Sequence, residues 1–265
     1  MTYQDVLYDK TDGIATITIN RPEVMNAFRS QTVDELVDAF KDAWGDRAIG
    51  AVIFTGAGPK AFCTGGDVAT RSESGYAAEK RARNDVGFDI DELHSVIRDI
   101  PKPVIAAVNG YAIGGGNVLQ VLCDLTIAAD TAKFGQVGPK VGSVDPGFGT
   151  AYLTHVVGEK KAREMWYLCE QYTAEQAVAM GLANKVVPAA KLMEEARAWA
   201  AKIVAMSPTA IKIAKQSFNS ETEHIRSTSA LGITAVTLYY GSEEAMEGKR
   251  AFAERRKPDF RKFRV

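Results

Sequence analysis

The chain changes its pattern at about residue 190, and this change constrains the fold more than any other feature. Before it, segments of helical spacing alternate with short apolar or β-branched runs at 13–20, 51–55, 103–108 and 125–128. After Pro188, no strand-like run separates the four helical patterns at 191–206, 208–218, 225–240 and 243–255. Alternating strands and helices predict an α/β fold whose strands pair largely in parallel. We therefore expect an α/β core over residues 1–190 and a helical region over residues 191–265.

The predicted helices have recognisable periodicity and start signals. Apolar residues recur at helical spacing over 31–44, and residues 117–123 also have a helical pattern. Ser207 stands directly before Pro208, which suits an N-cap followed by a proline at the first helical position. A helical tail on an α/β core usually packs back on the core or contacts another subunit. At 265 residues, the chain can bury one sizeable core with a small appended region.

Composition and charge exclude several classes of protein. Hydrophobic residues make up 46% of the chain, charged residues 25%, and the net charge is −1, which calls for neither nucleic acid nor an anionic membrane as partner. No apolar run reaches the length of a membrane-spanning helix, and the N-terminus lacks the features of a secretory signal. The cysteines Cys63, Cys123 and Cys169 have no metal-ligand spacing and suit a reducing compartment. We therefore predict a cytoplasmic protein without a metal site.

Three glycine-rich loops carry the candidate functional residues. The loops at 64–67 and 113–116 each follow an apolar run that is typical of a buried strand. The third, at 134–151, places Ser143 and Asp145 two residues apart. Glycine turns present backbone N–H groups that no Cβ shields, so two of them converging on one point would form an oxyanion hole beside the Ser/Asp pair. One glycine turn alone is usually structural, and it is the combination that indicates a site.

Other motifs give weaker indications. Residues 114–116 do not match the dinucleotide-binding or P-loop patterns, and the G-x-S-x-G nucleophile elbow is absent. His94, His155 and His224 lie in helical patterns without a nearby ligand spacing, and we interpret them as structural. The polar segment 68–89 is interpreted as a mobile loop over the site.

The residues alone do not decide the role of two features near the C-terminus. Tyr239 and Tyr240 suit either core or interface packing or a catalytic role. The basic residues at the end form either a solvated tail or a contact for an anion; they are Arg255, Arg256, Lys257, Arg261, Lys262 and Arg264.

Taken together, these motifs resemble the crotonase (enoyl-CoA hydratase/isomerase) superfamily over essentially the whole chain. The resemblance is carried by residues 20–22, 26–28, 62–67, 102–106, 110–116, 123–125, 177–183 and 207–208. It implies a crotonase spiral of ββα units with a C-terminal helical region that forms trimers, and trimers commonly pair into hexamers. It also implies an acyl-CoA thioester as substrate, with the thioester oxygen held by the N–H groups of Gly66 and Gly115.

Departures from the hydratases narrow the resemblance. Hydratases use two glutamates as acid and base, whereas this chain has Val118 and Gly138 at the matching positions, so we predict no simple enoyl-CoA hydration. Residues 136–145, 157–164 and 256–260 resemble the dihydroxynaphthoyl-CoA synthase branch. Within it, the chain is most similar to the 2-ketocyclohexanecarboxyl-CoA hydrolases at 92–94, 97–99, 116–119, 144–147, 215–219 and 238–240. The synthases usually carry an arginine where this chain has Met25.

The resemblance implies hydrolytic ring cleavage of a cyclic β-ketoacyl-CoA through a thioester enolate. We expect Asp145, its pKa raised by partial burial, to act as general base toward water. Ser143 would hydrogen-bond the ring carbonyl or the gem-diol. Tyr240, from its own or a neighbouring subunit, would donate a proton to the enolate carbon or orient the ketone. The other implied substrate or CoA contacts are Asn26, Ala27, Thr64, Gly65, Asp67, Tyr111, Ile113, Gly114, Gln136, Val137, Gly138, Arg255 and Lys257. Gly138 would leave room for the ring or for a small anion such as bicarbonate, and no cofactor is required beyond the coenzyme A of the substrate.

Two alternatives remain beside this hypothesis. The first is the reverse chemistry, a ring-closing Claisen condensation that makes dihydroxynaphthoyl-CoA with the same residues. The second is a crotonase homologue without catalysis that acts as a scaffold or binds RNA. The presence of Ser143, Asp145, Tyr240 and both glycine turns argues against the second alternative, whereas sequence alone does not separate ring opening from ring closing.

Overall fold

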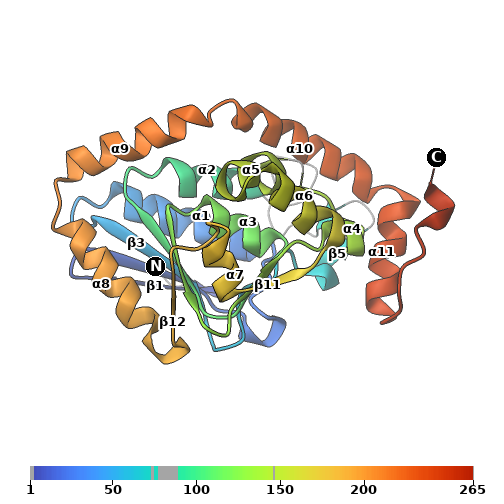
Figure 1. Cartoon of the computed structure of the whole chain (residues 1–265), viewed down its shortest axis with the longest axis horizontal. Helices are drawn as coiled ribbons and strands as arrows, with labels where there is room; N and C mark the ends of the chain where they lie inside the picture. Colours follow the sequence, from blue (N-terminus) through green and yellow to red (C-terminus); the bar gives the residue numbers. More distant parts are fainter. Residues whose placement is uncertain (1–2, 73–74, 77–88, 146, 265) are drawn as a thin grey trace.

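The computed structural model describes residues 3–72, 75–76, 89–145 and 147–264 and contains two stacked sheets (Figure 1). One sheet has the order β1–β2–β3–β7–β9–β12; its strands are Val6–Thr11, Ile14–Ile19, Ala51–Gly56, Val104–Val108, Leu125–Ala129 and Lys185–Val187. The other has the order β11–β10–β8–β4; its strands are Gln171–Thr173, Lys133–Gly135, Tyr111–Ile113 and Ala61–Cys63. Within these sheets only β1–β2 and β10–β11 pair antiparallel, which confirms the predicted α/β fold with largely parallel strands. Strands β5 (Arg71–Ser72) and β6 (Gly75–Tyr76) form a separate antiparallel pair.

Helices cover the sheets and fill the connections between strands. The α-helices of the first two thirds are α1 (Ser30–Gly45), α2 (Ile90–Asp99), α3 (Gly115–Leu122), α4 (Gly138–Val141), α5 (Leu153–Val157), α6 (Glu159–Leu168) and α7 (Ala174–Ala179). A π-helix spans Phe148–Tyr152, and short 3₁₀ turns lie at Pro22–Val24, Val68–Thr70, Ala189–Lys191 and Arg261–Phe263. The helices predicted over 31–44 and 117–123 are therefore confirmed as α1 and α3.

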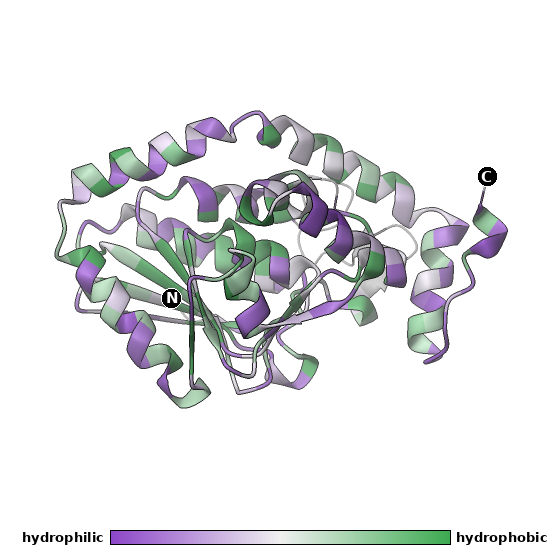
Figure 2. Cartoon of the chain, viewed as in Figure 1, coloured by the Kyte–Doolittle hydropathy of each residue, from purple (hydrophilic) through white to green (hydrophobic). Residues whose placement is uncertain are grey.

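The central strands are buried on both faces, which explains their continuous apolar sequence. All residues of β3 and β7 are buried, as expected for parallel strands covered by helices on either side. The ring of Phe54 packs edge-on against Phe40 of α1 and Phe62 of β4, with ring centroids 5.5 Å and 5.1 Å apart. Figure 2 shows these strands in the hydrophobic colour, whereas the outer helices have mixed colours. One aromatic-rich core thus joins the two sheets.

The C-terminal third is helical, as predicted, but its first helix belongs to the core. Helix α8 (Leu192–Val204) packs on the face of the six-stranded sheet away from α1, where Leu192, Ala196 and Ala200 are buried against the strands. The region that leaves the sheet therefore begins after α8 rather than at residue 190. It comprises α9 (Pro208–Glu221), α10 (Ile225–Tyr240) and α11 (Glu243–Ala253), which arch over the molecule in Figure 1.

Helix α9 has the predicted N-cap, and a buried lysine fixes it to the core. The Ser207 side chain accepts a hydrogen bond from the N–H of Ala210, which confirms the predicted N-cap. The buried ammonium group of Lys215 on α9 donates to the carboxylate of Asp124 at 2.7 Å and to the carbonyl oxygens of Ile97 and Lys102. These bonds hold α9 on the core, and α10 then contacts α2 and the π-helix in the third glycine-rich loop.

Candidate active site

The first two glycine loops lie in contact with each other at the ends of β4 and β8. A Cβ on Gly65, whose φ is +88°, would lie 3.0 Å from the backbone nitrogen of Gly115. A Cβ on Gly115 would lie 3.3 Å from the Cα of Gly65. Only glycine permits this close approach together with the positive φ. The structure thus brings the two predicted donor loops together.

The backbone geometry leaves the N–H groups of Gly66 and Gly115 without an acceptor in the part of the chain that the structure describes. Phe28 forms a parallel bridge with Gly66, in which the N–H of Phe28 donates to the Gly65 carbonyl and the N–H of Asp67 donates to the Phe28 carbonyl, both at 2.8 Å. The N–H of Gly66 itself therefore points away from Phe28. Gly115 is the first residue of α3, where an N–H has no partner inside the helix. Among the described residues, none accepts a hydrogen bond from either group.

The carboxyl group of Asp145 lies beside α3, one turn after Gly115. Its Oδ2 would lie 2.6 Å from a Cβ on Gly149, and the Cγ2 of Val118 would lie 3.0 Å from the same point. Val118 is fully buried and is the position at which the resemblance implies a glutamate in hydratases. Asp145 therefore places a carboxyl group next to the apolar side chain of Val118 in α3.

Burial raises the pKa of the Asp145 carboxyl above its usual value. The N–H groups of Gly149 and Gly147, each 3.3 Å from Oδ1, oppose this effect in part. A raised pKa makes the carboxylate a stronger base than an exposed aspartate, so this group is chemically suited to accept a proton from water.

Ser143 and Tyr240 form the second polar pair of this region. The Ser143 Oγ and the Tyr240 hydroxyl are 2.8 Å apart, within one chain, and Tyr240 is buried. Ser143 follows Gly142, the C-cap of α4, whose φ is +67°. A Cβ on Gly142 would lie 2.6 Å from the carbonyl oxygen of Ala245 in α11. The C-terminal helices therefore hold both hydroxyl groups in place.

The surroundings of Gly138 differ from the prediction. A Cβ on Gly138 would lie 2.7 Å from the carbonyl oxygen of Ser143 and 2.9 Å from Cζ3 of Trp166. The expectation that Gly138 leaves room for a ring or an anion is wrong for the side-chain direction, because the chain itself fills that space. The neighbouring Gln136 is almost completely buried, and its Nε2 has no hydrogen-bond partner among the described residues.

Two residues that the resemblance assigns to substrate contacts make hydrogen bonds within the chain. The buried amide of Asn26 donates from Nδ2 to the carbonyl oxygens of Ala57 and Ala61 at 2.9 Å and 2.7 Å. The carboxylate of Asp67 accepts from the Arg21 guanidinium at 3.0 Å and from the N–H of Ala69. Both side chains therefore already make hydrogen bonds within the chain, and their contact with a substrate stays a prediction.

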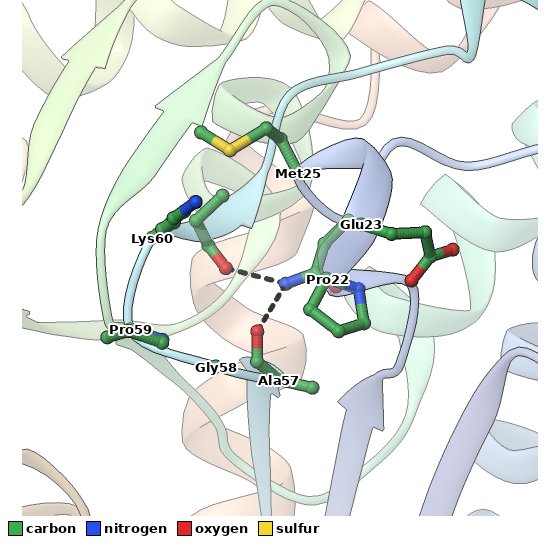
Figure 3. Close-up of a pocket in the computed structure, with 9 residues that line it drawn as sticks. Pro22, Glu23, Met25, Ala57, Gly58, Pro59 and Lys60 are labelled. Carbon is green, nitrogen blue, oxygen red and sulfur yellow. Dashed lines mark hydrogen bonds between the residues drawn. The ribbon is translucent and has the colours of Figure 1, made fainter.

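A pocket of about 290 Å³ opens beside Asn26 (Figure 3). Its lining includes Met25, Asn26 and Lys60 together with the turn at 57–59. Lys60, which the sequence reasoning did not single out, immediately precedes β4 and brings a positive charge to the pocket. Its place in the turn Gly58-Pro59-Lys60, directly before the strand that ends in the glycine loop, is the signal that could have identified it.

The other predicted contact residues are distributed along these loops. The Thr64 hydroxyl donates to the carbonyl oxygen of Met25 at 3.2 Å, and the Ala27 carbonyl accepts from Arg21. In the β8–β10 pair, Ile113 lies opposite Gly135, and the N–H of Gly114 donates to the Gly135 carbonyl. A Cβ on Gly114 would lie 3.4 Å from Val137 Cγ2, which places Val137 against this loop.

Three predicted contacts are not brought to the glycine loops. Tyr111 begins β8 and is 38% exposed, and Arg255 and Lys257 are exposed on the segment after α11. In the part of the chain that the structure describes, no contact joins these three side chains to Gly66 or Gly115. The loop predicted over 68–89 lies mostly outside the described residues.

The sheets, the glycine loops and the C-terminal helices together define the crotonase fold. The chain belongs to the enoyl-CoA hydratase/isomerase family, whose model matches residues 9–263. It is therefore a crotonase-family enzyme that processes acyl-CoA.

Solved structures agree with this assignment over nearly the full length. The chain is 34% identical to a carnitinyl-CoA hydratase from Mycobacterium avium, with 97% of this chain and 98% of that chain covered and a TM-score of 0.82. It is 26% identical to an enoyl-CoA hydratase from Mycobacterium avium subsp. paratuberculosis K-10 (98% and 99% covered, TM-score 0.84). It is 25% identical to an enoyl-CoA hydratase/isomerase from Pseudoalteromonas atlantica T6c (97% and 100% covered, TM-score 0.86). These names describe hydratases and isomerases rather than ring-cleaving hydrolases or naphthoate synthases. None of the helices that the structure describes is long and apolar enough to cross a membrane.

Proposed function

We propose that the protein hydrolyses a cyclic β-ketoacyl-CoA, such as 2-ketocyclohexanecarboxyl-CoA, to the open-chain product pimeloyl-CoA. The observation that carries the proposal is the carboxyl group of Asp145 beside Val118. A basic group is present beside Val118 of α3, the helix that begins at Gly115, but it comes from the third loop and not from the α3 position at which hydratases have a glutamate. The arrangement supports proton chemistry that differs from hydration.

The first step is the addition of water to the ring ketone. Asp145 accepts a proton from the water as the water oxygen bonds to the ketone carbon. Ser143 donates a hydrogen bond to the ketone oxygen, which becomes negative. The raised pKa of Asp145 favours this proton transfer. The Ser143–Tyr240 contact supports the proposal because it orients the Ser143 hydroxyl.

The second step is the cleavage of the ring. The bond between the former ketone carbon and the α-carbon breaks, and its electron pair moves into the thioester to give an enolate. The N–H groups of Gly66 and Gly115 hydrogen-bond the enolate oxygen, on which charge develops in the transition state. Tyr240 then donates a proton to the α-carbon. The net result is the addition of one water molecule across a carbon–carbon bond, with a new carboxyl group at one end and a C–H bond at the other.

Crotonyl-CoA hydration is not the favoured reaction in this proposal. Hydration needs an acid and a base placed across the substrate double bond, and Val118 and Gly138 carry neither. The similarity to proteins named hydratases identifies the family of this chain. Val118 and Gly138 distinguish the chain from the hydratases within that family.

Ring closure by a Claisen condensation uses the same enolate and is the second candidate. It shares Asp145, Ser143, Tyr240 and both N–H donors, and Met25 in place of the synthase arginine counts against it.

The coenzyme A portion is assigned to the pocket beside Asn26. Lys60 supplies a cation for a phosphate group at the mouth of this pocket. Arg255 and Lys257 are too exposed to be fixed within one chain, and contact with the coenzyme A of another subunit remains part of the proposal. Self-association as a trimer or hexamer is supported by apolar side chains on α9 and α10 that are more than half exposed, namely Ile213, Phe218, Leu231 and Leu238.

Mass spectrometry of the products tests the proposal. The purified protein should convert 2-ketocyclohexanecarboxyl-CoA to pimeloyl-CoA, and in H₂¹⁸O one labelled oxygen should enter the new carboxylate. Parallel incubations with succinylbenzoyl-CoA and crotonyl-CoA cover the two competing activities. Formation of dihydroxynaphthoyl-CoA would favour ring closure, and rapid hydration of crotonyl-CoA would contradict the proposal.

A further inference from the structure

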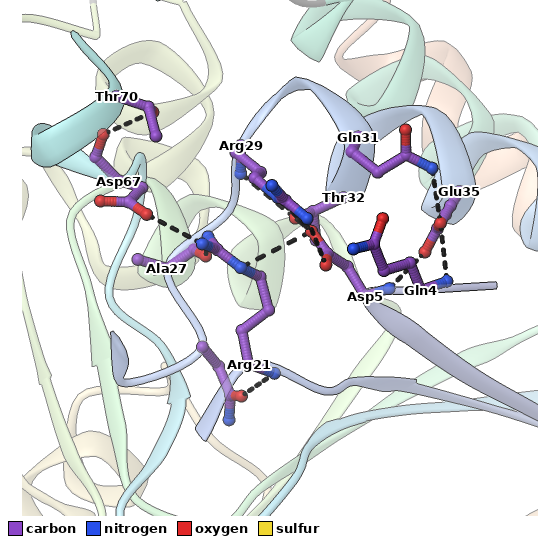
Figure 4. A network of polar contacts seen from close by, with 11 residues as sticks. Gln4, Asp5, Arg21, Ala27, Arg29, Gln31, Thr32, Glu35, Asp67 and Thr70 are labelled. Carbon is purple, nitrogen blue, oxygen red and sulfur yellow. Dashed lines mark hydrogen bonds and ion pairs between the residues drawn. The ribbon is translucent and has the colours of Figure 1, made fainter. Parts of the chain in front are cut away.

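We infer that Arg21 is a positioning residue that sets the relative placement of the Gly66 and Gly115 N–H groups. The inference rests on the proposed use of these groups as an oxyanion hole. Arg21 follows β2, and its side chain is 11% exposed. The guanidinium group donates from Nη1 to the carbonyl oxygen of Ala27 and from Nη2 to Oδ2 of Asp67 at 3.0 Å (Figure 4).

The two acceptors flank the bridge that orients Gly66. Ala27 immediately precedes Phe28, and Asp67 immediately follows Gly66, so one guanidinium group holds both segments of the Phe28–Gly66 bridge. Arginine suits this task because its planar fork offers several donors in fixed directions, whereas lysine offers one compact ammonium group.

The same bridge contacts the second donor loop. The Cζ atom of Phe28 lies 2.9 Å from the position that a Cβ on Gly115 would occupy, so the Phe28 ring packs directly on Gly115. A shift of residues 27–28 would therefore move Gly66 through the backbone and Gly115 through the ring. An oxyanion hole depends on both N–H groups pointing to one oxygen position. The distance between the Gly66 and Gly115 N–H groups therefore affects the rate of the reaction.

The neighbouring Arg29 provides a matched control. Both arginines approach Asp5, with Arg29 at 2.8 Å and 3.0 Å and Arg21 at 3.5 Å, but only Arg21 contacts Asp67 and the Ala27 carbonyl. Thr32 also donates to Asp5, at 2.6 Å, so Asp5 keeps hydrogen bonds when either arginine is replaced. A loss of general stability would affect both variants, whereas a loss of donor placement would affect only the Arg21 variant.

The test measures carbonyl polarisation with a ligand that cannot be cleaved. Cyclohexanecarboxyl-CoA labelled with ¹³C at the thioester carbonyl lacks the ring ketone, and its carbonyl stretch should move to lower wavenumber on binding to the wild-type protein. Arg29→Gln should keep this shift, Arg21→Gln should lose most of it, and Arg21→Lys should keep an intermediate fraction. The dissociation constant of the labelled ester should change by less than about fivefold in Arg21→Gln, because most of the binding surface is untouched.

Turnover gives the second readout. The kcat of Arg21→Gln should fall more than its KM rises, and the loss should stay below the roughly 10²- to 10³-fold cost of removing one oxyanion-hole donor. Asp67→Asn, which keeps the side-chain shape, replaces Arg21→Gln if the latter does not fold, and it should also reduce the carbonyl shift.

The outcomes separate this inference from the proposed reaction. An unchanged carbonyl shift in folded Arg21→Gln or Asp67→Asn, an equal loss in Arg29→Gln, or no shift in the wild-type protein would each overturn the role of Arg21. A wild-type shift without formation of pimeloyl-CoA from 2-ketocyclohexanecarboxyl-CoA would instead contradict the proposed reaction and leave the Arg21 comparison valid.

Discussion

The hydroxyl groups of Ser143 and Tyr240 lie 2.8 Å apart within one chain, although 97 residues separate them in sequence. Ser143 comes from the loop after α4, and Tyr240 is the last residue of α10. The backbone of α10 also packs closely on this loop, since a Cβ on Gly147 would lie 2.8 Å from the Cα of Ser229. The structure therefore supports a site to which the C-terminal helices of the same subunit contribute the tyrosine.

Tyr240→Phe should lower kcat while the oligomer persists. The change keeps the packed ring and removes only the hydroxyl that contacts Ser143, so a loss of roughly 10²- to 10⁴-fold would match the removal of a proton donor. Steady-state kinetics and sedimentation measure the two effects, and Tyr239→Phe is the neighbouring control. An unchanged kcat in an intact oligomer would restrict Tyr240 to packing.

Mixed oligomers test whether one chain provides both groups. Because Ser143, Asp145 and Tyr240 belong to the same chain, subunits with Tyr240→Phe and subunits with Asp145→Asn should not restore each other when they are reassembled. The activity of the mixed oligomers should equal the sum of the activities of the two variants assayed separately. Mass spectrometry verifies that the oligomers contain both kinds of subunit. Clear recovery would show that a site draws on two chains.

Asp145→Asn should abolish most turnover but leave binding of CoA esters nearly unchanged. The asparagine keeps an oxygen that can accept from Gly147 and Gly149 and loses the ability to take a proton, so kcat should fall by roughly 10²- to 10⁴-fold. Comparison of kcat with the dissociation constant of cyclohexanecarboxyl-CoA separates the two effects. A variant with near wild-type kcat would place the base elsewhere.

Asp145 also predicts how stability and activity depend on pH. Burial disfavours the ionised carboxyl, so above its raised pKa the folded state carries an energetic cost that is relieved as the pH falls through that pKa. Asp145→Asn should therefore raise the melting temperature at neutral pH, with a smaller gain in acid. The rate should rise with pH through a pKa above the ordinary aspartate value, because the base must be ionised. A lower melting temperature of Asp145→Asn at neutral pH would contradict this assignment.

Lys215→Met should destabilise the protein much more than a change elsewhere on α9. Lys215 is buried and pairs with Asp124 at 2.7 Å, and its loss would leave that carboxylate without its cation. Because Asp124 is partly exposed, we expect a decrease in the free energy of unfolding of about 3 kcal/mol, at the low end for a broken buried pair. Urea denaturation measures the change, with exposed Lys212→Met as control. Equal effects of the two substitutions would show that the buried pair adds little.

The predictable parts of the fold are those with a long periodic signal. Continuous apolar runs predicted β3 and β7, and helical spacing predicted α8 and α10. A strand buried on two faces and a helix buried along one stripe each have a recognisable pattern of apolar residues in the local sequence. The strands β8, β10, β11 and β12 have three residues each, which is too short for either period. Strand β1 was missed for a different reason, since only Val6 among its residues is buried.

The candidate site, like the fold, was predictable from the sequence only in part. Glycine loops could be located because their residue types demand unusual backbone geometry. The hydrogen bonds of Asn26 and Asp67 could not be anticipated, because their partners Ala57 and Arg21 lie 31 and 46 residues away, and a family motif does not distinguish a ligand contact from a backbone anchor. The filled space beside Gly138 likewise depends on Trp166, which belongs to another element.

The position of Tyr240 at the end of α10 has a consequence for synthesis on the ribosome. Asp145 leaves the ribosome about 95 residues before Tyr240 does, and the first two glycine loops leave it earlier still, so a nascent chain contains its donor loops while the tyrosine is still absent. Unlike the Tyr240→Phe variant, such a chain would also lack the helices that pack on the third loop. Catalytic competence would then arrive late in translation, when the last helices dock.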